Sequence, residues 1–336
     1  MNSKLAVRLV VLGLFFAGAA WTLSHVDWGD LQRRVMGASA TDLGLMLLAW
    51  TTSLFVRPLR FRFLLGVLGQ GPRAKYVQVW AANTLGMAVN SFTAMRAGDV
   101  VVTLLLRHRH GIDIHRSLTV IVADALCDFV CVAFLFLGAL PFAPISAAWA
   151  VRAAYALAIA AALVLAGVIV VVWLRHRLLA LFERILDRLD VGRGERLRGI
   201  AHDVLAAASV VANWKVCLPL ILFTVLIWGV IGLSYWLGMR AVSIEPSISV
   251  ASFAMAAVAL SFVVPLGPGG LGAFEAAVVV ALVLFGVPLG AAIAFAIIAH
   301  ACQLGSVVLL AGFAVTTQNI DYRSLLSAAE KPGATS

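Results

Sequence analysis

The residues of this chain that are best suited to chemistry are polar and charged side chains that interrupt long apolar segments. A charged group inside a membrane is costly and rare, so each one is a candidate for function. We expect the following residues to line a substrate-binding site, and we expect none of them to be catalytic or to hold a metal. They are Asn90, Ser91, Arg96, Asp99, Asp124, Asp128, Pro268, Gly269, Gly270, Gly272 and Glu275.

Arg96 has the clearest chemical preference among these residues. Its planar guanidinium stays protonated and can donate two parallel hydrogen bonds to a phosphate group. We expect Asp99, Asp128 and Glu275 to balance its charge when no ligand is bound, or to carry protons. A second interpretation, in which Arg96 and the acids Asp124 and Asp128 only form structural ion pairs, stays open.

The segment from 264 to 275 reads Val-Pro-Leu-Gly-Pro-Gly-Gly-Leu-Gly-Ala-Phe-Glu, a run of helix-breaking residues closed by a carboxylate. In lipid, an unwound backbone survives only where protein or a wet cavity satisfies its polar groups. The backbone N–H groups of Gly269, Gly270 and Gly272 could form an anion-binding site at a helix start. Alternatively, the glycines only permit a tight turn.

Common enzyme signatures are absent from the sequence. It has no His-Glu-x-x-His, no Gly-x-Ser-x-Gly, and no Gly-Lys-Ser/Thr after the glycine-rich run. His108, His110 and His115 lie in a basic loop whose only carboxylate is Asp113, which does not suit a metal site. His300, in a long apolar segment, is expected to be a packed, hydrogen-bonded side chain. We therefore expect no enzymatic activity, no cofactor and no metal.

The composition places these residues in a membrane protein. The chain is 62% hydrophobic and 12% charged, with a mean hydropathy of +1.02, whereas soluble domains are about 45–50% apolar and about 25% charged. The net charge of +9 is explained by Lys and Arg in cytoplasmic loops, so nucleic acid is not an expected partner. The four cysteines lie in apolar segments and are expected to be packed thiols.

The predicted fold is an all-α polytopic membrane protein with about six full spans and two re-entrant or broken helical hairpins. The spans are expected near 5–23, 43–56, 117–140, 153–174, 216–237 and 289–315. The first of these could instead be a cleaved signal peptide. The segment from 57 to 65 alternates cations with apolar residues, and we predict an interfacial segment on the cytoplasmic side.

The two hairpins are predicted at 76–106, with Arg96 near the tip, and at 248–287, with the proline- and glycine-rich run at the tip. They suggest an inverted repeat within one membrane domain at 1–320, with halves at about 40–140 and 215–316. We predict a cytoplasmic amphipathic linker at 175–215 and a cytoplasmic tail at 321–336. A solvated linker helix is an equally good interpretation of 175–215.

These segments resemble the flippase-like membrane region of lysylphosphatidylglycerol synthases, over roughly residues 10 to 315. The resemblance is carried by Asn90 through Arg107, by the span with Asp124 and Asp128, and by Pro265 through Glu275 followed by Gly-Val-Pro at 286–288. The chain departs from the family where Asp99 replaces a Glu and where Asp124-Ala125 replaces a Glu-Arg pair. We expect the synthases' soluble aminoacyl-transfer domain to be absent.

The resemblance implies a bacterial inner-membrane protein that translocates an anionic phospholipid or a lipid-linked precursor. Its head group would be held between the two opposed hairpins. The distribution of Lys and Arg over the predicted loops places both termini in the cytoplasm. One alternative is a non-transporting scaffold of a lipid or lipid-linked glycan pathway, whose 175–215 segment recruits a cytoplasmic enzyme of that pathway. The other is a membrane-embedded lipid-modifying enzyme that uses Asp124, Asp128 and Glu275.

Overall fold

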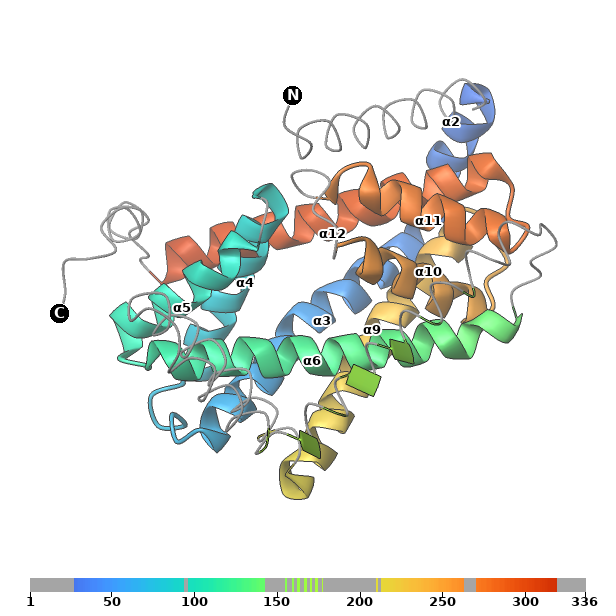
Figure 1. The fold of residues 1–336 in the computed structure, drawn as a ribbon. Coiled ribbons are helices and arrows are strands. Elements are labelled where there is room, and N and C mark those ends of the chain that lie inside the picture. Colours follow the sequence, from blue (N-terminus) through green and yellow to red (C-terminus); the bar gives the residue numbers. More distant parts are fainter. Residues whose placement is uncertain are drawn as a thin grey trace, which may run out of the picture.

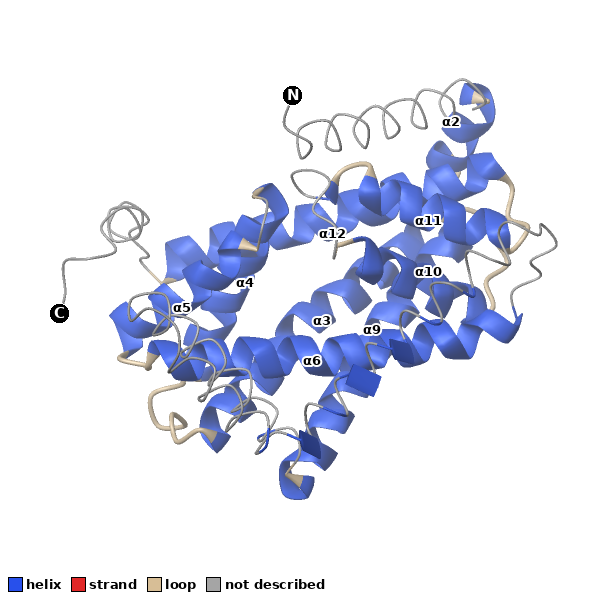
Figure 2. Cartoon of the chain, in the orientation of Figure 1, coloured by secondary structure: helices blue, strands red, loops and turns tan. Residues whose placement is uncertain are grey.

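The computed structural model describes residues 27–93, 96–142, 213–262 and 270–318, with isolated positions between 155 and 177 and at 210. Within these ranges the chain forms nine α-helices and one short 3-10 helix, and no strand (Figure 1, Figure 2). The all-helical prediction is confirmed for this part of the chain. The predicted span at 5–23, most of the span at 153–174 and nearly all of the linker at 175–215 lie outside the described residues.

Among the helices that the structure describes, three are long and apolar enough to cross a membrane. They are α6 (Ile114–Ala139, continued by the 3-10 turn Leu140–Phe142), α9 (Trp214–Ala241) and α12 (Leu289–Thr317). About 20 apolar residues suffice to span the hydrocarbon core. These helices confirm the spans predicted at 117–140, 216–237 and 289–315.

Helices α2 (Trp28–Met36) and α3 (Ala40–Val67) meet at an angle of 78° and could together form a fourth span. Side chains fix both starts, since Asp27 accepts a hydrogen bond from the backbone of Asp30 and Ser39 accepts one from Asp42. The angle between the two helices falls at this capped junction.

The predicted interfacial segment at 57–65 is wrong, because α3 continues through Pro58 to Val67. Arg60, Phe61 and Leu64 within it are buried in the bundle. The physical reason is that Asp124 and Asp128 of α6 neutralise Arg57 and Arg60, so this part of α3 can remain inside the bundle.

Two pairs of shorter helices form hairpins where the sequence predicts them. Helix α4 (Tyr76–Phe92) packs on α5 (Ala97–His110), and α10 (Ile248–Ser261) packs on α11 (Ala273–Leu284). Helix α12 contacts both α4 and α11, and Figure 1 shows the two hairpins toward opposite ends of the molecule. The inverted relationship between the two halves stays a prediction.

In the first hairpin, α4 and α5 pack closely where Gly98 lies against Gly86. A Cβ atom built on Gly98 of α5 would lie 1.8 Å from the carbonyl oxygen of Gly86 in α4. No side chain larger than hydrogen fits at that distance, so Gly98 sets how closely the two helices approach.

The apolar core is divided into two clusters. One joins α10 and α11 to the adjoining parts of α3, α6, α9 and α12, and the other joins α4 and α5 to the opposite parts of α3, α6 and α9. On α6, Val120 and Ala123 belong to one cluster, whereas Val132 and Phe136 belong to the other. Asp124 and Asp128 lie between them, so a charged layer crosses the bundle between its two apolar regions.

Candidate functional site

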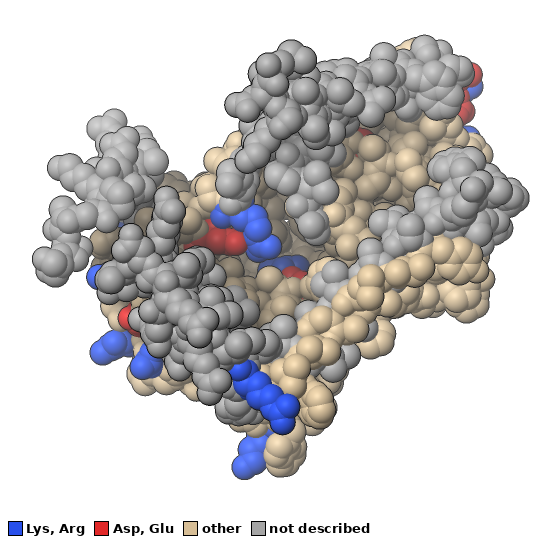
Figure 3. Space-filling view, in the orientation of Figure 1, with Lys and Arg blue, Asp and Glu red and all other residues tan. Residues whose placement is uncertain are grey.

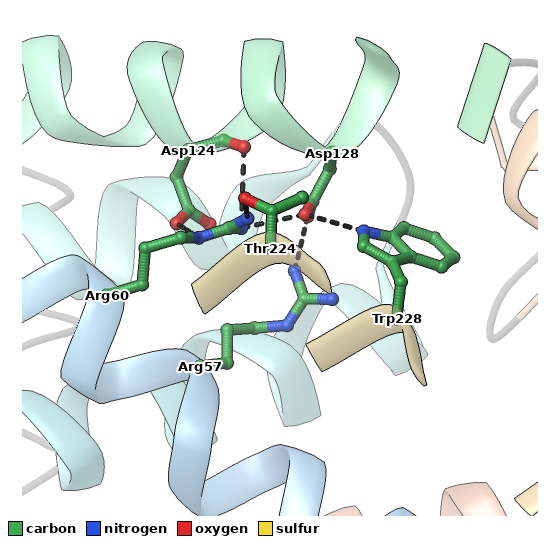
Figure 4. Close-up of polar contacts among 6 residues, drawn as sticks. All are labelled: Arg57, Arg60, Asp124, Asp128, Thr224 and Trp228. Carbon is green, nitrogen blue, oxygen red and sulfur yellow. Dashed lines mark hydrogen bonds and ion pairs between the residues drawn. The ribbon is translucent and has the colours of Figure 1, made fainter. Parts of the chain in front are cut away.

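Side chains from three helices, α3, α6 and α9, form the charged layer (Figure 4). We call this group of side chains the charged cluster. Its members are Arg57, Arg60, Asp124, Asp128, Thr224 and Trp228. Asp124 and Asp128 are four residues apart, so they share one face of α6, as the sequence predicts. Arg57 and Arg60 are three residues apart on α3, and Thr224 and Trp228 are four apart on α9.

Arg60 is the centre of the charged cluster and is fully buried. Its Nε donates to Asp124 Oδ1 at 2.7 Å and its Nη2 donates to Asp128 Oδ1 at 2.7 Å. Its Nη1 donates to Thr224 Oγ1 at 2.9 Å. Every nitrogen of the guanidinium therefore has a partner, which is the condition under which a buried arginine is tolerated.

Asp128 joins the remaining members of the cluster. Its Oδ1 also accepts a hydrogen bond from the indole N–H of Trp228 at 3.0 Å, and its Oδ2 accepts one from Arg57 Nη1 at 2.6 Å. Two guanidinium groups thus face two carboxylates, and the cluster has no net charge. This balance explains how four ionised groups can lie between apolar regions.

Arg57 forms the open edge of the charged cluster. The side chains of Arg57 and Asp128 are 22% and 19% exposed, whereas Arg60 is 0% exposed. Among the described residues, Nε and Nη2 of Arg57 have no hydrogen-bond partner. Figure 3 shows one face of the molecule hollowed near its centre, with basic and acidic atoms together in and beside the hollow. Nε and Nη2 of Arg57 can therefore donate hydrogen bonds to a further acceptor group.

The tip of the first hairpin holds a second polar group. Arg96 has a left-handed backbone (φ 56°), its side chain is 66% exposed, and its Nε donates to Asp99 Oδ2 at 2.9 Å. Asn90 links the two helices, because its amide donates to Asp99 and accepts from the backbone N–H of Gly98 at 2.7 Å. Ser91 donates to a carbonyl of its own helix. The predicted residues Asn90, Arg96 and Asp99 thus come together, and Ser91 does not join them.

The second hairpin places Glu275 at the start of α11. Its Oε2 accepts the backbone N–H of Gly272 at 2.7 Å, and its Oε1 lies 2.7 Å from Nδ1 of His300 on α12. Gly270 and Gly272 have φ values of 67° and 80°, which other residues rarely adopt, so the glycines permit the turn here. Pro268 and Gly269 lie outside the described residues.

The predicted charge balance of Arg96 needs correction. Asp99 is its partner, as predicted, but Asp128 binds Arg57 and Arg60, and Glu275 binds His300. Asp128 therefore pairs with cations of α3, and Glu275 pairs with a histidine of α12. Arg57 and Arg60 are three residues apart and so share one helical face, as Asp124 and Asp128 do at a spacing of four. This pattern is the signal that could have identified the charged cluster.

Comparison with known proteins gives one match. No curated protein and no solved structure matches the chain. The family described as "Lysylphosphatidylglycerol synthase TM region" matches residues 5–312, which include all the described helices up to most of α12. This match confirms the resemblance drawn from the two hairpin segments, and it agrees with the long apolar helices in indicating a multi-pass membrane protein linked to lipid handling. The chain therefore belongs to the family of the lysylphosphatidylglycerol synthase transmembrane region.

Proposed function

We propose that this protein binds the head group of an anionic phospholipid or lipid-linked precursor inside the membrane and translocates it between leaflets, as a flippase does. The observation that carries the proposal is the charged cluster, a neutral set of ionised groups between two apolar regions with Arg57 at its open edge. The family's link to lipids supports the choice of substrate class.

A purely structural cluster does not explain the state of Arg57. Arg60, three residues away, is enclosed, and every guanidinium nitrogen is hydrogen-bonded. Within the described part of the chain, Arg57 forms a hydrogen bond through one nitrogen and stays partly exposed. Nε and Nη2 of Arg57 have no partner among the described residues. Together they present the planar fork of N–H donors that phosphate oxygens bind. Arg57 is thus suited to receive a phosphate at the open edge of the charged cluster.

The remaining hydrogen bonds of Asp128 keep the cluster stable when a ligand competes with Asp128 for Arg57. If a phosphate takes Arg57, Asp128 Oδ1 still accepts hydrogen bonds from Arg60 and Trp228. The carboxylate is therefore never left as an unpaired buried charge, which would be the costly outcome. The exchange between Asp128 and a phosphate at Arg57 is consequently reversible, as a transport cycle requires.

In this proposal the two hairpins flank the bound head group while its acyl chains stay in lipid. Arg96 at the exposed tip of the first hairpin provides an initial contact for the anion. We place the protein in the bacterial inner membrane with both termini in the cytoplasm, because that orientation puts most Lys and Arg inside. We propose no enzymatic step and no cofactor.

Translocation in reconstituted vesicles tests the proposal. We expect wild-type protein to move fluorescent phosphatidylglycerol across the bilayer. A charge-assisted hydrogen bond contributes about 1.5–3 kcal/mol, so Arg57→Gln should slow transport about 10- to 100-fold. Arg33→Gln is the matched control, since Arg33 is 74% exposed and 3.8 Å from its partner Asp30; we expect it to transport normally.

If anionic lipids cross the bilayer no faster in vesicles with the wild-type protein than in vesicles without it, translocation is refuted and the scaffold alternative is favoured. In that alternative, binding of a cytoplasmic lipid-pathway enzyme would depend on 175–215, which lies almost wholly outside the described residues.

A further inference from the structure

We infer that Glu275 and His300 together form a proton-binding site that joins the start of α11 to α12. The inference concerns the contact between the second hairpin and α12, and it stands whether or not the protein moves lipid.

The geometry is that of a carboxylate–imidazole pair fixed on three sides. Glu275 Oε1 lies 2.7 Å from His300 Nδ1, and Glu275 Oε2 accepts the N–H of Gly272 at 2.7 Å. The imidazole stacks on the ring of Phe274, with centroids 4.4 Å apart and planes inclined by 23°. The His300 side chain is 9% exposed and that of Glu275 is 29% exposed, so the imidazole is enclosed while the carboxylate is partly exposed.

The pair is isolated from other charges along the chain. Between positions 246 and 320, Glu275 is the only Asp, Glu, Lys or Arg, and His300 is the only histidine. When the imidazole is protonated, the pair is neutral as a unit. When the proton leaves, a carboxylate remains in an apolar hairpin that offers no cation of its own, and burial of such a net charge is unfavourable.

The helices packed against α11 and α12 do not supply a substitute cation. Helix α10 has no ionisable side chain. The ionisable residues of α2, α3, α4, α9 and α12, besides His300, are Asp30, Arg33, Arg34, Asp42, Arg57, Arg60, Arg62, Tyr76, Lys215, Cys217, Tyr235, Arg240 and Cys302. The ion pairs formed by the charged members of this set are with one another or with Asp124 and Asp128. Among the described residues, His300 is the only ion-pair partner of Glu275.

Protonation of this site has a structural consequence because Glu275 also caps α11. With a protonated imidazole, the bond between Nδ1 and Oε1 joins two charges and is stronger than a bond to a neutral ring. Loss of the proton weakens that bond and leaves the carboxylate uncompensated. The first turn of α11 and its contact with α12 should therefore loosen as the pH rises.

Hydrogen–deuterium exchange of the protein in lipid nanodiscs, measured between about pH 5 and 8, where histidine changes charge, tests the inference. After correction for the intrinsic exchange rate, we expect protection of backbone amides in 273–284 to fall about tenfold across one transition. This factor is the difference between a charge-assisted and a neutral hydrogen bond.

Two variants test whether the pH transition arises from the pair of Glu275 and His300. Glu275→Gln and His300→Asn each keep a hydrogen-bonding side chain but remove one titrating partner, so each should abolish the transition or displace it by more than about one pH unit. Asp42→Asn removes a carboxylate that pairs with Arg240 and should leave it unchanged. A flat wild-type profile, or an unchanged midpoint in either folded variant, would overturn the inference.

Discussion

Replacement of Arg60 by methionine tests whether the charged cluster holds the three helices together. Arg60 is fully buried and donates hydrogen bonds to Asp124, Asp128 and Thr224. Methionine has a similar length but cannot donate a hydrogen bond. In Arg60→Met, Asp128 keeps Arg57 and Trp228, whereas Asp124 loses its only ion-pair partner among the described residues.

The expected loss follows from the charge that remains. Breaking a buried ion pair by removing one partner costs about 3–5 kcal/mol, chiefly because the other charge is left uncompensated. We therefore expect the free energy of unfolding to fall by about 3–5 kcal/mol. Asp124→Leu in the same protein removes the stranded carboxylate and leaves the balanced pair of Arg57 and Asp128. The double variant Arg60→Met/Asp124→Leu should recover at least about 2 kcal/mol, since apolar replacements of buried pairs are often close to neutral.

Unfolding by SDS titration in mixed micelles, followed by circular dichroism, measures these differences. Arg33→Met is the control, since its side chain is 74% exposed and the change should stay within about 0.5 kcal/mol. The reasoning fails if Arg60→Met is as stable as this control, or if the second substitution makes the protein less stable instead of rescuing it.

Two further substitutions test local packing and hydrogen bonding by the same titration. Gly98→Ala should destabilise the first hairpin by about 1–3 kcal/mol, because the added Cβ would overlap the Gly86 carbonyl. Gly138→Ala is the control and should be neutral or slightly stabilising, because nothing lies within 4 Å of that position. Equal effects of the two substitutions would contradict the close approach of α4 and α5. Trp228→Phe should cost about 1.5–3 kcal/mol by removing the indole bond to Asp128, whereas an unchanged stability would mean that this bond contributes nothing.

The helix positions could be predicted from sequence because they depend on local properties. Long apolar runs identify α6, α9 and α12, and the polar break after Phe92 marks the end of α4. The glycine- and proline-rich run likewise separates α10 from α11. In each case the residue types that form or interrupt a helix lie at the boundary itself.

The pairing of charges could not be predicted in this way, because it depends on contacts between distant helices. Arg60 meets Asp124 and Asp128 across 64 and 68 positions, and Glu275 meets His300 across 25. A cluster of cations around Pro58 is typical of a loop, and only the acids on α6 explain why it lies in a helix. Similarly, the sequence predicts a packed, hydrogen-bonded His300 but does not identify Glu275 as its partner.

Binding of phosphatidylglycerol, measured by native mass spectrometry of the purified protein, tests most directly whether a lipid phosphate binds at the open edge of the charged cluster. We predict that Arg57→Gln lowers the apparent affinity about 10- to 100-fold, because one charge-assisted bond is lost, and that Arg33→Gln leaves it unchanged. Equal affinity of the wild-type protein and Arg57→Gln would contradict the central claim.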